Sequence, residues 1–71
     1  MVKQSIIEAF KSNGVSVRVR VFKHVGGAMY RACVLGERPH DADVVGAVAA
    51  KVGAYAFTIN QDYEACIRVA A

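Results

Sequence analysis

Cysteine is scarce in this chain, with two in 71 residues. Two cysteines cannot form the disulfide framework of a small secreted protein, and these two lack the Cys/His spacing of a structural zinc site. A chain near this length buries only about 60% of the surface that its unfolded state exposes. We therefore expect a plain hydrophobic core, with no metal and no cofactor, extended by a contact between copies of the chain.

Long apolar runs are also absent. The longest one covers residues 44–50, whereas a membrane-spanning helix needs about 18 or more apolar residues. Lys3, Gln4 and Glu8 stand where a secretion signal needs its apolar segment. We therefore expect a protein that makes no membrane contact and lies in the cytoplasm, where thiols stay reduced. A hydrophobic share of 55% excludes a disordered chain.

The motifs that assemble catalytic groups are missing too. Gly26-Gly27 is not part of a nucleotide-binding glycine loop, and no serine stands in a nucleophile elbow. A helix start explains Asp41 and Asp43, and neither His24 nor His40 has a partner in the sequence, which is typical of solvated histidines. We predict a non-enzymatic protein without a catalytic residue.

In the first half of the chain, apolar residues recur at helical spacing, and valines then alternate with other residues. The first pattern predicts a helix and the second a half-buried strand. A glycine ends the helix, and a glycine pair marks a tight turn between strands. The predicted elements are a helix over 2–12 ended by Gly14, a strand over 15–22, a turn at Gly26-Gly27 and a strand over 29–35.

The second half, after Pro39, repeats this order. Asp41 is placed to cap a helix and Lys51 lies in its last turn, as the helix dipole favours. The predicted elements are a helix from Asp41 to Gly53, a strand over 54–59, a loop at Asn60-Gln61-Asp62 and a strand over 63–69.

The order α-β-β-α-β-β predicts one α+β domain over residues 1–71, with halves at about 1–36 and 40–71. It favours a four-stranded antiparallel sheet with both helices on one face. This two-layer sandwich resembles a ferredoxin-like fold with its first strand moved to the end, a likeness that carries no function. Residues 30–34 and 63–67 share the pattern Tyr-x-Ala-Cys, and their strands are expected side by side at the sheet centre.

The turn in the first hairpin predicts which side chains lie on the sheet face without helices. A two-residue turn places Val19 opposite Val34 and Lys23 opposite Tyr30, and opposite side chains share a face. The intervening residues then point away from the helices, with Phe22 opposite Arg31 at cation–π range. With the second hairpin, the predicted open face carries Arg18, Arg20, Phe22, His24, Met29, Arg31, Cys33, Leu35, Thr58, Glu64, Cys66 and Arg68.

The second hairpin leaves two registers open. A three-residue loop pairs Ile59 with Tyr63 and turns Tyr55, Phe57 and Ile59 toward the core. A two-residue loop turns the same side chains outward, because a slip of one residue reverses the faces. We favour the three-residue loop, since it buries the large apolar groups.

Charge is distributed unevenly along the chain. Residues 1–38 hold seven basic side chains against two acidic ones, and residues 39–71 hold two against four. Such a chain can attract an anionic partner, or pair head-to-tail with a copy of itself. An unevenly charged, solvated surface explains the same counts.

We predict a binding surface centred on Arg18, Arg20, Phe22 and Arg31, where basic charge and an exposed aromatic ring coincide. The first hypothesis is a protein-interaction module that forms a homodimer or binds another protein. The alternative is a nucleic-acid-binding module that stacks bases on the sheet, although the RNP1 pattern is missing. Cys33 and Cys66 are expected to be small, unreactive filler.

In format, a short single domain without catalytic motifs, the chain resembles the small inhibitors encoded by phages and other mobile elements, anti-CRISPR proteins included. The resemblance covers no motif and assigns no role to any residue. It implies an inhibitor that works by occupying a partner's surface.

Overall fold

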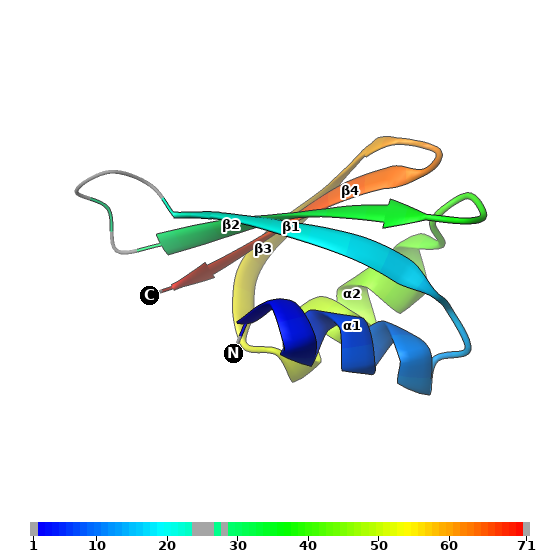
Figure 1. The fold of residues 1–71 in the computed structure, drawn as a ribbon, viewed down its shortest axis with the longest axis horizontal. Coiled ribbons are helices and arrows are strands. Elements are labelled where there is room, and N and C mark those ends of the chain that lie inside the picture. Colours follow the sequence, from blue (N-terminus) through cyan, green and yellow to red (C-terminus); the bar gives the residue numbers. More distant parts are fainter. Residues whose placement is uncertain (1, 24–26, 28, 71) are drawn as a thin grey trace.

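The chain forms six elements in the predicted order. The computed structural model describes residues 2–23, 27 and 29–70 (Figure 1). The helices are α1 (Val2–Ser12) and α2 (Ala42–Lys51), and the strands are β1 (Val17–Lys23), β2 (Met29–Gly36), β3 (Ala54–Gln61) and β4 (Glu64–Ala70). Strand β1 begins later than predicted, because the amide of Val15 donates to the carbonyl oxygen of Phe10 at the end of α1.

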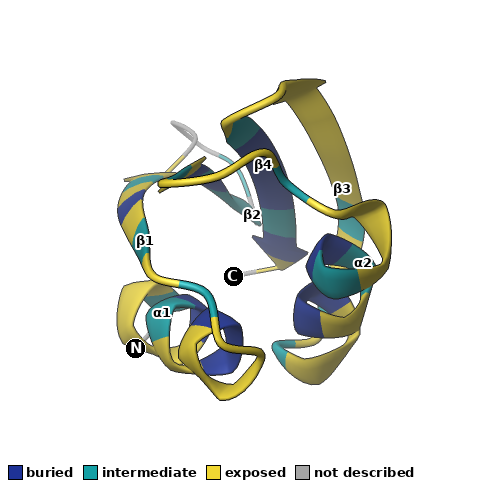
Figure 2. Cartoon of the chain, turned by 90° about the vertical axis from the view of Figure 1, so that its right-hand side faces the viewer, coloured by how far each residue is buried: buried dark blue, intermediate teal, exposed yellow. Residues whose placement is uncertain are grey.

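The strands form one antiparallel sheet in the order β1-β2-β4-β3. Both helices cover the same face of this sheet and leave the other face open (Figures 1 and 2). The α+β class and the permuted ferredoxin-like sandwich are therefore confirmed. Strands β2 and β4 are central, and Cys33 lies directly opposite Cys66. Within the described residues, neither helix is long and apolar enough to cross a membrane.

The core lies between the sheet and the two helices (Figure 2). Its members come from every element except β3, because β3 is an edge strand that the helices only partly cover. The buried core residues are Ile6, Ala9, Phe10, Val19, Ala32, Val34, Val45, Val48, Ala65, Ile67 and Val69.

The predicted helix ends are confirmed. Gly14 and Gly53 have φ values of 76° and 73°, a left-handed conformation that glycine adopts at little cost. At the start of α2, the Asp41 carboxylate accepts from the amide of Asp43 at 2.8 Å and from that of Val44 at 3.4 Å. These two bonds satisfy amides that would otherwise lack a partner at the helix start.

Removing this cap is expected to destabilise the protein measurably. Asp41→Ala should lower the free energy of unfolding by about 1 kcal/mol, because the cap bonds are lost. Urea denaturation followed by circular dichroism measures the change. Asp41→Ser keeps an oxygen at the cap and should retain most of the stability. Equal losses in both variants would show that the cap bonds contribute nothing.

The first hairpin has the predicted register. Val19 lies opposite Val34, and Lys23 lies opposite Tyr30. The predicted turn and His24 fall on residues 24–28, of which the structure describes only Gly27. The alternation of valine with other residues therefore assigns the two faces of this hairpin correctly.

The predicted loop of the second hairpin is wrong. Strand β3 continues to Gln61, which pairs with Glu64, so the turn is Asp62-Tyr63. Two tertiary bonds hold this turn: the amide of Gly36 donates to the Tyr63 carbonyl at 2.9 Å, and that of His40 donates to the Asp62 carbonyl at 2.6 Å. A turn held by residues more than 20 positions away cannot be inferred from its own composition.

The predicted burial of β3 is also wrong. Ile59 pairs with Ala65 and Phe57 with Ile67, so both share the helix-covered face, as predicted. They are nevertheless exposed to 37% and 39%, because α2 covers this edge only partly. Tyr55 lies where the register shifts and is 57% exposed, and its hydroxyl donates to the sulfur of Met29.

Candidate interaction face

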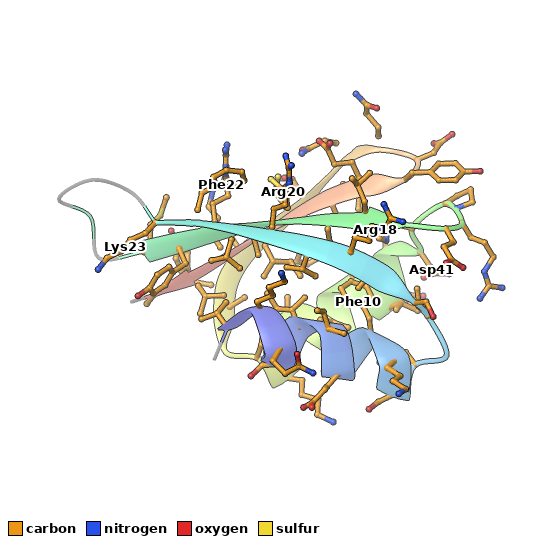
Figure 3. The ribbon with its side chains drawn as sticks, in the orientation of Figure 1. Phe10, Arg18, Arg20, Phe22, Lys23 and Asp41 are labelled. Atoms are coloured by element: carbon orange, nitrogen blue, oxygen red, sulfur yellow. The ribbon has the colours of Figure 1, made fainter. Side chains whose placement is uncertain are left out.

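The open face of the sheet is built from all four strands, which place alternate side chains away from the helices. Cross-strand pairing aligns these side chains in rows. One row is Phe22, Arg31, Arg68 and Ala56, the next is Arg20, Cys33, Cys66 and Thr58, and the third is Arg18, Leu35 and Glu64. Figure 3 shows Arg20 and Phe22 on this side, while Phe10 lies between α1 and the sheet.

All four residues of the predicted binding surface lie on this open face. Arg18, Arg20 and Phe22 come from β1, and Arg31 stands opposite Phe22 on β2. The Cζ atom of Arg31 lies 5.3 Å from the centre of the Phe22 ring, which confirms the expected cation–π contact. The structure therefore groups these residues, and their role in binding stays a prediction.

Arg68 belongs to the same surface and was missed as a binding residue. It lies directly opposite Arg31, because β4 inserts between β2 and β3. The prediction that the two Tyr-x-Ala-Cys strands are neighbours would have sufficed to place Arg68 beside Arg31. The arginine face, defined as Arg18, Arg20, Arg31 and Arg68, therefore combines residues from both halves of the chain.

The open face holds the entire net charge of the protein. Its four arginines are accompanied on the open face by one acidic residue, Glu64, whereas the charged residues elsewhere are five basic and five acidic. The predicted difference between the two halves of the chain thus becomes a difference between two faces of the molecule. Positive charge collected on one face attracts anionic partners to that face.

The guanidinium groups on this face keep their hydrogen-bonding capacity. Among the described residues, Arg18, Arg20 and Arg68 form no ion pair with a carboxylate. The Nε atom of Arg31 is buried and has no hydrogen-bond partner in the described part of the chain. The exposed guanidinium groups of Arg18 and Arg20 are available to carboxylates or phosphates of a partner, whereas the Nε atom of Arg31 is covered.

Apolar groups are exposed beside the arginines. Phe22 is 44% exposed and Leu35 is 49% exposed, whereas Met29 is half-buried. Phe22 belongs to the same row as Arg31, and Leu35 to the same row as Arg18. An exposed surface that mixes arginine with large apolar side chains has the composition of a protein interface core.

Cys33 and Cys66 are neighbours on the open face, as predicted. Their sulfur atoms are 3.7 Å apart, and both are free thiols. The Nδ2 atom of Asn60 donates to Cys66 Sγ at 3.0 Å. Desolvation by burial raises the pKa of Cys33, and the hydrogen bond to Cys66 raises it further.

A raised pKa makes the Cys33 thiol slow to react. At pH 8 a smaller fraction is thiolate than in an unfolded chain, and only the thiolate is nucleophilic. A Cys66→Ala variant loses the bond to Cys66 but keeps the larger cause, burial. In this variant, iodoacetamide should modify Cys33 more slowly in the native protein than in urea, and the difference should shrink as the pH rises. Mass spectrometry of timed samples measures both rates. A faster native reaction would contradict the raised pKa.

His40 is not the solvated histidine that the sequence suggests. Its ring lies 5.9 Å from that of Phe10, and its Nε2 atom is 3.1 Å from the carbonyl oxygen of Val34. The backbone amide of His40 also donates to Asp62. This half-buried side chain connects the loop before α2 to the core.

The rest of the described surface offers neither a metal site nor a catalytic cleft. Among the residues that the structure describes, no three His, Cys, Asp or Glu side chains are grouped to hold a metal ion. A groove of about 810 Å³ lies along β1, and its lining extends from α1 to the open face: Val2, Lys3, Val19, Arg20, Val21, Phe22 and Tyr30. Its lining is mainly apolar, and it brings no acid–base pair together.

Comparison of the chain with protein-family models, curated proteins and solved structures gave no match.

Proposed function

We propose that this chain is a non-enzymatic protein-interaction module that binds an acidic surface of another protein through its open face. One observation carries the proposal: the whole net positive charge lies on one face of the sheet, beside exposed Phe22 and Leu35. Steering by charge and burial of an aromatic anchor are the two main contributions to such binding. An inhibitor of the phage-encoded kind works in this way, by covering its partner's surface.

A protein partner is favoured over nucleic acid by the state of Phe22. Single-stranded nucleic acids bind open sheets by stacking bases on free aromatic rings. The guanidinium of Arg31 already lies over the Phe22 ring, so a base would have to displace it. Four arginines without acidic partners still fit a phosphate backbone, and nucleic acid is therefore the second candidate.

Affinity capture from a cell extract of the source organism separates the two candidates. The wild-type chain and an Arg18→Glu, Arg20→Glu variant are immobilised, and each is tested with and without nuclease treatment. We expect a protein that the wild type retains after nuclease treatment and the variant does not. Equal retention by both would contradict the proposal. Retention that nuclease abolishes would favour nucleic acid.

Salt titration of the captured complex gives an independent criterion. For nucleic acid, log affinity falls linearly with log salt, with a slope of roughly −0.7 to −0.9 per phosphate neutralised. For a protein interface anchored by Phe22, we expect a shallower dependence, because apolar burial is insensitive to screening.

A further inference from the structure

The free edge of β3 is a second surface with properties unlike those of the arginine face. Its sequence, Ala54–Gln61, contains no charged residue, and three of its large apolar side chains are exposed: Tyr55, Phe57 and Ile59. An edge strand presents unpaired backbone donors and acceptors. We call the strand together with these side chains the β3 edge.

The other edge of the sheet is protected in the usual way. Strand β1 carries Arg18, Arg20 and Lys23, and charged side chains on an edge strand oppose pairing with another strand. Pairing two copies of β1 about a two-fold axis would bring arginines of both copies together. The β3 edge has no such protection along its length.

Strand β3 is regular only in its middle. Its register with β4 shifts between Ala54 and Ala56 and again between Ile59 and Gln61. Between the two bulges, residues 56–59 form the straight part of the edge. The bulges limit the number of residues that an added strand can pair with. An added strand must therefore be centred on this short segment.

The helix beside β3 leaves the edge accessible. A Cβ atom added to Gly46 of α2 would lie 3.4 Å from Cζ of Phe57. Glycine at this position lets the ring lie close to the helix backbone. Phe57 thus keeps an exposed flank at the boundary between α2 and the edge.

We propose that two copies of this chain pair through the β3 edge as antiparallel strands about a two-fold axis, so that the two four-stranded sheets become continuous. At the two-fold axis one residue lies opposite its own copy, and residues opposite one another share a face. This residue is either Phe57 or Thr58, and each choice defines one register. In both registers Phe57 and Ile59 of the two copies meet on the helix-covered side. The apolar flank that each helix leaves exposed is covered by the other copy.

Charge favours a second copy as the occupant of this edge. The strand itself brings no like charges together. Lys51 precedes the start of β3 and Asp62 follows its end. Antiparallel pairing places the start of each strand near the end of the other, so each Lys51 approaches the partner's Asp62. An isologous contact of this kind closes on itself and does not grow into a filament.

The pairing also predicts how the open faces are arranged, a consequence that depends on the proposed function. The two-fold axis between antiparallel strands of one sheet is perpendicular to that sheet. Both arginine faces therefore lie on the same side of the dimer. A partner with two acidic surfaces would be bound with increased avidity, because the second contact becomes intramolecular.

The contact area is small. A standard interface covers about 10% of a small protein's surface on each side, and this chain exposes 4599 Å² in total. A short edge with three apolar side chains belongs to the weak class. We therefore expect a dimer whose population depends on concentration.

Opposite charges introduced at Thr58 test the pairing. Thr58 is exposed, lies on β3 opposite Cys66 and contributes nothing to the core, so its variants should fold normally. By analytical ultracentrifugation, the wild type should shift from monomer to dimer with rising concentration. Thr58→Lys and Thr58→Asp should each stay monomeric, and their mixture should recover the dimer. Circular dichroism verifies that both variants are folded.

The controls separate this proposal from the proposed function. Ser16→Lys adds the same charge beside the opposite edge and should leave the dimer intact. Arg20→Glu changes the arginine face and should weaken partner capture without changing the sedimentation of the free protein. A wild type that stays monomeric at every concentration, or a dimer that both Thr58 variants retain, would overturn the β3 pairing. Neither result would affect the binding proposed for the open face.

Discussion

Reversing two charges on the open face, Arg18→Glu with Arg20→Glu, is expected to lower the affinity for the protein partner by about 100-fold or more. Each substitution replaces an unpaired guanidinium with a carboxylate that faces the partner's acidic surface. Juxtaposed like charges cost several kcal/mol, and ~3 kcal/mol corresponds to a factor of about 100 in the dissociation constant. Titration calorimetry at constant salt measures the loss.

A matched control keeps the net charge change and moves it to another face. Lys3 and Lys11 are both exposed on α1, so Lys3→Glu with Lys11→Glu changes the net charge by the same amount. This control should change affinity only slightly. Phe22→Ala should weaken binding by roughly 30-fold, as expected for an aromatic anchor worth ~2 kcal/mol. If the double reversal on the open face and that on α1 have equal effects, binding depends on total charge alone.

Phe10→Ala is expected to remove a large share of the free energy of unfolding. Phe10 is fully buried between α1 and the sheet, against the ring of His40. Truncating a buried phenylalanine costs about 3 to 5 kcal/mol, while a chain of this length has a total stability of about 4 to 10 kcal/mol. Thermal denaturation followed by circular dichroism should show a much lower midpoint, or no transition.

The same substitution at Phe22 provides the control, because this ring lies on the open face and is nearly half exposed. Phe22→Ala should change the free energy of unfolding by much less than Phe10→Ala. Phe10→Leu, which keeps most of the apolar volume, should recover part of the stability. Similar losses in the free energy of unfolding at positions 10 and 22 would show that the burial of a phenylalanine side chain does not determine its contribution to stability.

The sequence by itself determined the six elements and the faces of the first hairpin. Helical and strand periods are local properties, and the valine alternation in β1 assigns Arg18 and Arg20 to the face opposite Val19. The capping oxygen of Asp41 and the glycine at position 53 act within a few residues of their own positions. These features need no knowledge of distant contacts, which is why they could be predicted.

The tertiary structure alone decided the turn of the second hairpin and the exposure of β3. The turn at Asp62-Tyr63 is held by the amides of Gly36 and His40, so its position depends on bonds between segments far apart in the chain. The exposure of Phe57 depends on how little of β3 the helix covers. These outcomes follow from long-range packing, which no local pattern of residues contains.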